Sequence, residues 1–269
     1  MILAAPECDV VNEVICAPAN VNELFEFTTP WFSIGVFDFT RTVFLIFLAA
    51  AIVIAWLYFG LRKKSVVPSK FQVVTESVVE FVRDGIGRDI IGPEGTKYVP
   101  YLLSLFMFIL VANFFEVAPF VNLPITARMA LPFFLSLTTY VIFVFVGFKK
   151  NGFSYLLETI WPSHVPLGLR WLVGIIELVS IFFLRPLTLA VRLFANMVAG
   201  HLMLVLLVGS GFIFLVAMPE IGFRSLIGIP WFVLGLGIFV FELVVIVLQA
   251  YIFTLLSAVY IQSSVQLEH

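Results

Sequence analysis

The chain has 269 residues, of which 62% are hydrophobic and only 12% are charged. Soluble domains carry roughly 25% charged residues, so this composition excludes an ordinary water-soluble globule and predicts a protein that crosses the membrane several times. The formal net charge is −2 and no basic cluster is long enough to follow a phosphate backbone, which excludes nucleic acid as a partner.

The first 41 residues form an acidic segment that we expect to lie outside the cell. Residues 1–40 contain six carboxylate side chains and neither Lys nor Arg, so the segment lacks the positively charged start of a signal peptide. Cys8 and Cys16 lie in this segment and are the only cysteines in the chain. The sequence leaves open whether they form a disulfide or remain free thiols.

Residues 42–98 are expected to hold the first membrane span and a surface helix. The apolar run 42–61 has the length of one span and ends in the basic cluster Arg62–Lys64, which the positive-inside rule assigns to the cytoplasm. Within residues 71–82, apolar side chains recur with helical spacing opposite polar ones, which predicts an amphipathic helix on the cytoplasmic surface. A Gly- and Pro-rich stretch, 85–95, then predicts a break.

Residues 99–150 are expected to form a pair of spans. The second apolar run extends from Tyr98 to Phe120, and the third extends from Met129 to Phe148. The third run ends in two lysines, so two independent basic clusters predict the same topology.

Residues 151–269 do not divide into spans of ordinary length. The stretch 171–218 has 48 residues without a polar loop and would be about 72 Å long as a helix, more than twice a roughly 30 Å hydrocarbon core. The stretch 232–261 adds 30 residues, or about 45 Å. We therefore predict two long, tilted helices joined by an outer turn at 219–230. The predicted fold is an all-α polytopic membrane protein with five membrane-embedded helices and one amphipathic surface helix.

Five ionisable residues interrupt these long apolar stretches, where a charged side chain costs about 2.5–3.5 kcal/mol. They are Glu177, Arg185, Arg192, His201 and Glu242. Such residues mark a pathway for ions or protons. The alternative is that some of them reach an interface or form a buried structural pair, which fits Arg185 best and Arg192 least.

Each of the two long helices carries one polar stripe, because its polar residues return to the same face at 100° per residue. The stripe residues are Thr188, Arg192 and Asn196 on the first helix, and Glu242, Gln249 and Tyr260 on the second. If the helices pair antiparallel about a turn centred near residue 221, Arg192 lies opposite Gln249. The same register brings His201 opposite Glu242, and a later turn centre would shift both pairs.

The two stripes differ in whether their side chains can take up and release a proton. A guanidinium keeps its proton at physiological pH, so Arg192 can only hold a carboxylate in its ionised form or repel a cation. His201 and Glu242 titrate near neutrality once their surroundings shift them, which makes them a proton-transfer pair on the outer side of Arg192. Glu177 lies 15 residues nearer the cytoplasm. No carboxylate of this chain is an obvious mate for Arg192, so we expect a partner subunit to supply it.

The run from Arg185 to His201, RPLTLAVRLFANMVAGH, followed by QAYIF from Gln249, resembles subunit a of the F-type ATP synthase. The resemblance covers the whole architecture and is most specific from Glu177 to Tyr260. It implies that Arg192 is the family's essential arginine, which faces the proton-carrying carboxylate of each c subunit.

The resemblance also implies roles for other polar residues. His201 and Glu242 stand where many bacterial members have an acid and a histidine, respectively, so the pair is exchanged and the order of proton transfer is open. The small residues at 199 and 200 allow close helix approach. Asn196 and Gln249 match polar residues at the c-ring interface, Glu177 an acidic position near the cytoplasmic access route, and Glu116 and Asn113 polar residues near the outer one. With Arg192 as seal, the candidate proton path therefore comprises His201, Glu242, Glu177, Asn196, Gln249, Glu116, Asn113 and Tyr260.

By this resemblance the chain is a proton-conducting stator subunit, with two offset half-channels to the rotating c-ring and an arginine seal between them, coupling proton flow to ATP synthesis. It is not catalytic by itself. The implied partners are c-ring subunits, b-type peripheral stalk subunits, the rest of the ATP synthase, the lipid bilayer and protons. We expect a bacterial plasma (inner) membrane location, with the N-terminus outside and the C-terminus in the cytoplasm. No cofactor or metal site is expected, because three His and two Cys are too few to ligate several haems.

A secondary membrane transporter is the main alternative, because intramembrane charges also mark substrate sites. That class predicts an internal repeat, and the two halves of this sequence show none. A single-chain channel fits poorly, since it needs a polar pore. An intramembrane protease is disfavoured because Gly209-Ser210-Gly211 lacks the fuller serine signature and no H-E-x-x-H motif occurs.

Overall fold

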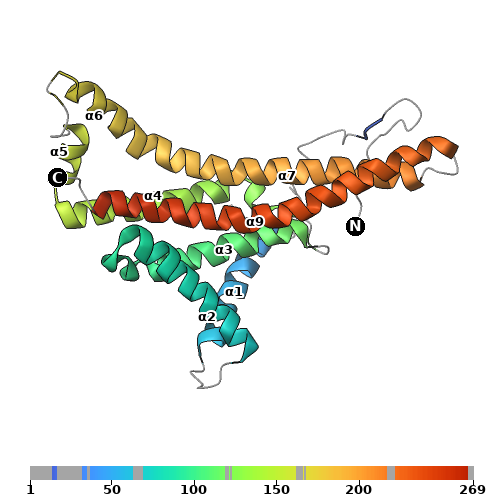
Figure 1. Cartoon of the computed structure of the whole chain (residues 1–269), viewed down its shortest axis with the longest axis horizontal. Coiled ribbons are helices and arrows are strands. Elements are labelled where there is room, and N and C mark those ends of the chain that lie inside the picture. Colours follow the sequence, from blue (N-terminus) through green and yellow to red (C-terminus); the bar gives the residue numbers. More distant parts are fainter. Residues whose placement is uncertain are drawn as a thin grey trace. The chain divides into compact units, whose positions relative to one another are not determined.

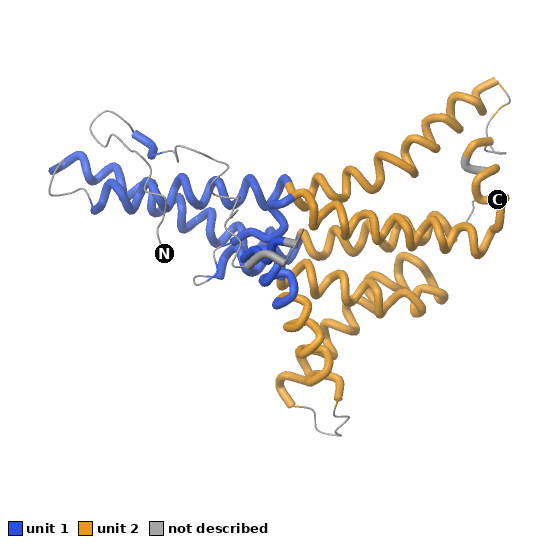
Figure 2. Tube along the Cα trace, turned by 180° about the vertical axis from the view of Figure 1, so that it is seen from behind, with its two compact units in different colours: residues 1–48, 112–128, 195–248 blue, residues 49–111, 129–194, 249–269 orange. Residues whose placement is uncertain are grey.

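The computed structural model describes residues 14–16, 32–34, 37–62, 69–118, 121, 123–161, 166, 168–216 and 222–265. Five helical segments are long and apolar enough to cross a membrane, which confirms the predicted all-α polytopic fold. They are Arg41–Leu61, Val99–Val117, Ala130–Asn151, Arg170–Val216 and Gly222–Val265. The chain divides into two compact units, shown in separate colours in Figure 2. Unit 1 contains residues 1–48, 112–128 and 195–248, and unit 2 contains residues 49–111, 129–194 and 249–269.

Part of what the sequence predicts lies outside the described residues. This part includes Cys8, Lys63 and Lys64, most of the acidic segment, and the first residues of the outer turn. Cys16 is described and is disulfide-bonded. A short antiparallel hairpin precedes the first span, with β1 (Phe32–Ile34) paired to β2 (Phe37–Phe39). This hairpin is too short to be recognised from alternation alone.

In unit 2, the surface helix α2 (Lys70–Val82) packs on the first span, α1 (Arg41–Leu61), through its polar side. The Thr75 hydroxyl accepts a hydrogen bond from the Trp56 indole at 3.1 Å. A Cβ added at Gly60 would lie 2.4 Å from the Thr75 Oγ1, so only glycine permits this approach. The amphipathic helix is confirmed, and its apolar side chains, such as Phe71, remain exposed on the other side, as expected of a helix on a membrane surface.

The predicted Gly- and Pro-rich break is wrong for most of its length. The chain stays helical through the wide-turn helix η2 (Arg83–Ile91) and the tight helix η3 (Pro93–Lys97), and it is interrupted only at Gly92, whose φ is +88°. Arg88 pairs with the Asp84 carboxylate one helical turn earlier at 2.9 Å, a spacing that supports a helix, and the neighbouring Arg83 guanidinium contacts the same carboxylate at 2.7 Å. This hydrogen bond holds the pKa of Asp84 below its usual range.

The predicted pair of spans is present as α3 (Val99–Val117) and α4 (Ala130–Asn151), with the single-turn helix η4 (Ile125–Ala127) between them. A further helix that the sequence did not reveal, α5 (Ser154–Ile160), follows α4. It has only seven residues, too few for a clear helical period.

The long stretch after α5 is helical over 47 residues, as predicted. It consists of α6 (Arg170–Val179), the wide-turn helix η5 (Ser180–Leu184) and α7 (Arg185–Val216). Pro186 lacks a backbone N–H and lies where the wide turns end and α7 begins, so the proline is accommodated without ending the helix.

The return helix, α9 (Gly228–Val265), is longer than predicted, because it begins before Pro230. Pro230 therefore belongs to the first turn of the helix, where proline is well tolerated, and not to the outer turn. The outer turn instead contains the short helix η6 (Gly222–Ile227).

In unit 1, α7 and α9 run side by side and antiparallel (Figure 1). A Cβ at Gly211 would lie 2.7 Å from the Phe232 backbone nitrogen, and a Cβ at Gly235 would lie 2.7 Å from Val208. These close approaches match a turn centred near residue 221, so the predicted register is confirmed in this unit.

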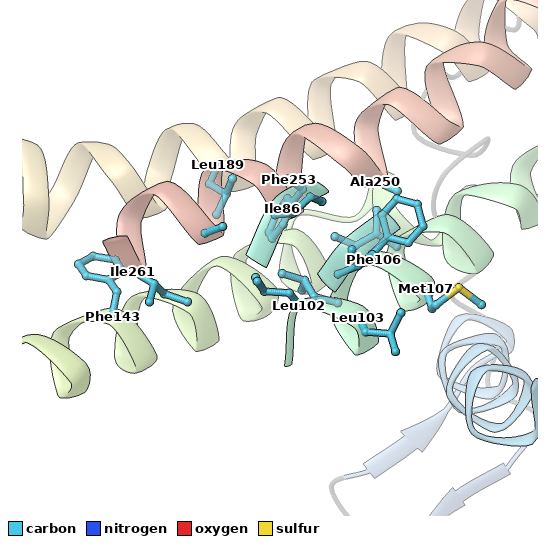
Figure 3. Close-up of a cluster of buried hydrophobic side chains, with 14 of the residues drawn as sticks. Ile86, Leu102, Leu103, Phe106, Met107, Phe143, Leu189, Ala250, Phe253 and Ile261 are labelled. Carbon is cyan, nitrogen blue, oxygen red and sulfur yellow. The ribbon is translucent and has the colours of Figure 1, made fainter. Parts of the chain in front are cut away.

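Unit 2 has one extended apolar core (Figure 3). Buried side chains from several helices meet there, so the N-terminal part of α7 and the C-terminal part of α9 pack against α3 and α4. The core includes Ile86 of η2, Leu102 and Phe106 of α3, Phe143 of α4, Leu189 and Leu193 of α7, and Phe253 and Ile261 of α9. Hydroxyls add a polar link, since Tyr101 bonds to Thr139 at 2.7 Å.

Candidate functional site

Unit 1 contains a buried cluster of ionisable side chains from three helices. His201 of α7 lies with its Nδ1 3.8 Å from the Oε1 of Glu116 of α3, and both side chains are almost fully buried. Glu242 of α9 is also buried and interacts electrostatically with Glu116. The cluster therefore brings one imidazole and two carboxylates together inside otherwise apolar helices, where ionisable groups are costly and usually functional.

A glycine makes room for the Glu242 carboxylate. A Cβ added at Gly200 of α7 would lie 2.5 Å from the Glu242 carboxyl carbon, so any larger residue would displace it. Because Gly200 directly precedes His201, this approach also puts His201 and Glu242 at the same level of the hairpin. The sequence-based pairing of these two residues is thus supported by the helix register.

The outer end of α3 adds an amide to the same part of unit 1. Asn113 is fully buried and accepts a hydrogen bond from the Thr126 hydroxyl at 2.9 Å. Asn113 precedes Glu116 by three residues, so the two side chains lie on neighbouring positions of one helix face. Asn113 and Glu116, which the sequence connected only loosely with the site, therefore belong to the region around His201.

Arg192 of unit 2 has a different environment. Its neighbours Leu189 and Leu193 are buried in the core of unit 2, whereas Arg192 itself is exposed. It forms no hydrogen bond or ion pair with any residue that the structure describes. Asn196, one helical turn later, is exposed as well. Because α7 is otherwise apolar, an exposed guanidinium on its surface is positioned to interact with a group outside this chain.

The remaining predicted residues of unit 2 differ in their exposure and contacts. Gln249 is buried, and Glu177 of α6 is half-buried without a hydrogen bond or ion pair to the described part of the chain. The Tyr260 ring lies beneath Arg185, whose guanidinium carbon is 5.3 Å from the ring centroid. Arg185 also donates to the exposed Ser263 hydroxyl at 2.8 Å, so its contacts lie on α9 but do not make a buried pair.

Within the described ranges, no group of three or more His, Cys, Asp or Glu side chains is arranged so that it could hold a metal ion. The cluster of unit 1 instead combines two carboxylates and an imidazole. Such an arrangement can accept and release protons at the positions of Glu116, His201 and Glu242.

Comparison with known proteins connects this geometry to one family. The family model described as ATP synthase A chain matches residues 43–262. The chain belongs to the ATP synthase subunit a family. Among its relatives, ATP synthase subunit a of Frankia alni is 40% identical over 264 residues, covering 93% of this chain and 89% of the relative. The corresponding subunit of Rhodococcus erythropolis is 38% identical, covering 85% and 83%, and that of Cereibacter sphaeroides is 31% identical, covering 95% and 91%.

Family membership confirms the resemblance that the sequence showed between Glu177 and Tyr260, and the match extends over nearly all described helices. Two features of the site were not predicted. Thr126 lies in a loop whose sequence carries no periodic signal, and the direct approach of Glu116 to His201 depends on packing of α3 against α7. The only available signal was the spacing of three residues between Asn113 and Glu116.

Proposed function

We propose that this chain is the proton-conducting stator subunit of an F-type ATP synthase, presenting two offset half-channels and an arginine seal to a rotating c-ring. The proposal rests on family membership and, above all, on the combination of a buried cluster of ionisable groups with an exposed Arg192 that pairs with no residue the structure describes. It includes b-type peripheral stalk subunits as partners and a bacterial plasma membrane location.

The outer half-channel would use the cluster of unit 1. Protons entering from outside would pass the region of Asn113 and Glu116 and reach His201 and Glu242, an imidazole and a carboxylate that can take up and release a proton. The buried position of all four side chains supports this role, because ionisable groups in an apolar membrane interior are retained for transport.

Arg192 would separate the two half-channels. A guanidinium remains charged, so it favours the ionised form of a passing c-ring carboxylate and blocks protons from crossing directly. The exposure of Arg192 and its lack of a partner among the described residues support contact with another subunit. A leak past it would dissipate about 2.3 kcal/mol per proton for each 100 mV of membrane potential.

Glu177 would serve the cytoplasmic half-channel. It lies 15 residues before Arg192, on the helical run that continues into α7, and its side chain is partly accessible. A proton leaving a c-ring carboxylate beside Arg192 would then reach the cytoplasm past Glu177. Gln249 and Asn196 would line the face that meets the ring.

The decisive experiment is ATP-driven acidification of inverted membrane vesicles that carry the complex with wild-type chain or with Arg192→Ala. We expect the variant to assemble, as shown by blotting, and to lose pumping. Arg88→Ala is the matched control, because Arg88 is an exposed arginine of η2 whose ion pair with Asp84 lies at the surface and contributes little to stability. Robust coupled pumping by an assembled Arg192→Ala complex would refute the proposal.

A further inference from the structure

Thr126 is a buried hydroxyl that neither the sequence pattern nor the proposed function uses. It lies in η4, between α3 and α4, and its side chain is fully buried. Its Oγ1 donates to the Asn113 Oδ1 at 2.9 Å, across 13 residues of chain. A bond between two fully buried polar side chains indicates a specific arrangement, because a buried donor or acceptor without its partner costs free energy.

The loop that carries Thr126 folds back along the end of α3. The Leu123 backbone N–H donates to the Phe115 carbonyl at 3.3 Å, and the Ala127 N–H closes a tight turn onto the Pro124 carbonyl at 3.2 Å. Irregular backbone of this kind is tolerated at membrane depth only where protein buries it or water lines it. The two backbone bonds hold Thr126 beside Asn113, about one turn inside the end of the helix.

The bond from Thr126 occupies the carbonyl end of the Asn113 amide. The other end, Nδ2, is buried and has no hydrogen-bond partner among the described residues. One turn further along α3, the two carboxylate oxygens of Glu116 are buried and likewise lack hydrogen-bond partners within the described chain. An amide donor and a carboxylate acceptor on one helix face complement each other, and buried groups of this kind are commonly bridged by water.

We propose that Thr126 is a positioning residue of the outer proton route, which fixes the Asn113 amide so that its NH2 group faces the path that leads to Glu116. This inference rests on the proposed function. The route then presents a donor at Asn113 and acceptors at Glu116, with His201 of α7 and Glu242 of α9 facing Glu116 from the other two helices. Water between Asn113 and Glu116 would be oriented with its lone pair toward the amide and its hydrogens toward the carboxylate.

If the Thr126 side chain only packs the loop in place, different results are expected. Thr126→Val keeps the shape of the side chain and removes the hydroxyl, whereas Thr126→Ser keeps the hydroxyl and removes a methyl group. If the hydroxyl positions Asn113, only the valine variant is impaired. If the side chain merely fills space, valine is tolerated and serine is the weaker substitute.

The test measures ATP synthesis by inverted vesicles carrying the whole complex, driven by an imposed proton gradient. We expect Thr126→Val to lower the rate by about three- to tenfold, the effect of losing one buried hydrogen bond, and Thr126→Ser to retain it. Asn113→Leu should lower the rate at least as much, and adding Thr126→Val to Asn113→Leu should cause no further loss. Thr254→Val is the matched control, since Thr254 is an equally buried threonine whose hydroxyl bonds only to its own helix.

An assembled Thr126→Val complex with the wild-type rate would overturn the inference, as would equal loss in Thr126→Ser or additive losses in the double variant. Arg192→Ala, measured in the same vesicles, separates this outcome from failure of the proposed function. If Arg192→Ala abolishes synthesis while Thr126→Val leaves it unchanged, only the role of Thr126 is refuted. If Arg192→Ala retains synthesis, the proposed function itself fails.

Discussion

Gly200 lies so close to Glu242 that a methyl group at residue 200 would come within 2.5 Å of the Glu242 carboxyl carbon. This approach sets the depth at which the carboxylate enters the helix pair, and His201 is the next residue on the same helix. The glycine thus places two titratable groups from antiparallel helices at one level. It also explains why a residue without a side chain directly precedes His201 on α7.

The first prediction concerns Gly200→Ala. The added methyl group must push the Glu242 carboxylate away from its position, and we expect ATP-driven pumping to fall roughly ten- to a hundredfold, as when a reacting group is displaced by about 1 Å. Acidification of inverted vesicles measures this effect. Gly209→Ala is the control, because a Cβ there meets nothing within 4 Å and should leave pumping unchanged. Equal pumping rates in the two variants would show that the close approach of Gly200 to Glu242 does not affect proton transport.

The second prediction compares a double variant of the buried cluster of unit 1 with a single variant at the far end of the α9 stripe. His201→Ala combined with Glu242→Ala removes two groups of the buried cluster, so we expect proton loading to slow by about a hundredfold or more. Tyr260→Phe keeps the ring beneath Arg185, and we expect a change of no more than about twofold. The initial rate of acidification distinguishes them. Similar losses in both would remove the entry role from the cluster.

Much of the fold could be predicted because lipid imposes simple rules. Apolar length alone gave the spans of α1, α3 and α4, and the excess length of the α7 and α9 segments predicted two long helices. The rules failed where local contacts override composition. The glycines of η2 did not break the chain, since the ion pairs of Asp84 and wide helical turns keep it helical, and Pro230 opens α9 instead of ending a turn.

The site was predictable only to the extent that it follows helical periodicity. The opposition of His201 and Glu242 follows from counting residues back from the turn, and the close approach of Gly200 agrees with it. The contact of Glu116 with His201 joins residues 85 positions apart in sequence, and Thr126 reaches Asn113 from an irregular loop. Neither contact follows a repeating spacing along the chain, so the periodicity of a single sequence does not predict it. The contact of the Tyr260 ring with Arg185 is likewise not predicted by its place on the polar stripe.

A third prediction tests how α2 is held on α1. Gly60→Ala would bring a methyl group within 2.4 Å of the Thr75 hydroxyl, and we expect the two helices to separate at a cost of about 1–3 kcal/mol. The melting temperature of the purified complex should fall accordingly. Gly85→Ala is the matched control, because the nearest atom to its added Cβ is 3.9 Å away. A melting temperature equal to that of the control would mean that α1 and α2 are not joined at this point.

The fourth prediction concerns the N-terminal residues that lie against the outer part of the hairpin in unit 1. The Cys16 backbone N–H donates to the buried Ser210 hydroxyl at 3.0 Å, and the Trp231 indole donates to the Val14 carbonyl at 3.0 Å. Ser210→Ala leaves the Cys16 N–H without its acceptor, and we expect this attachment to weaken by about 1–3 kcal/mol. Hydrogen exchange at the peptide that contains Val14 and Cys16 should then be faster in the assembled complex.

Trp231→Phe removes the second anchor and should add to the effect of Ser210→Ala, since the two bonds hold different residues of the attached segment. Trp171→Phe serves as control, because Trp171 is an exposed tryptophan with no hydrogen bond in the described part of the chain. Unchanged exchange in Ser210→Ala would show that the disulfide-bonded Cys16 is held against the hairpin by other contacts. Faster exchange confined to Ser210→Ala and Trp231→Phe would establish these two side chains as the anchors of the segment that contains Val14 and Cys16.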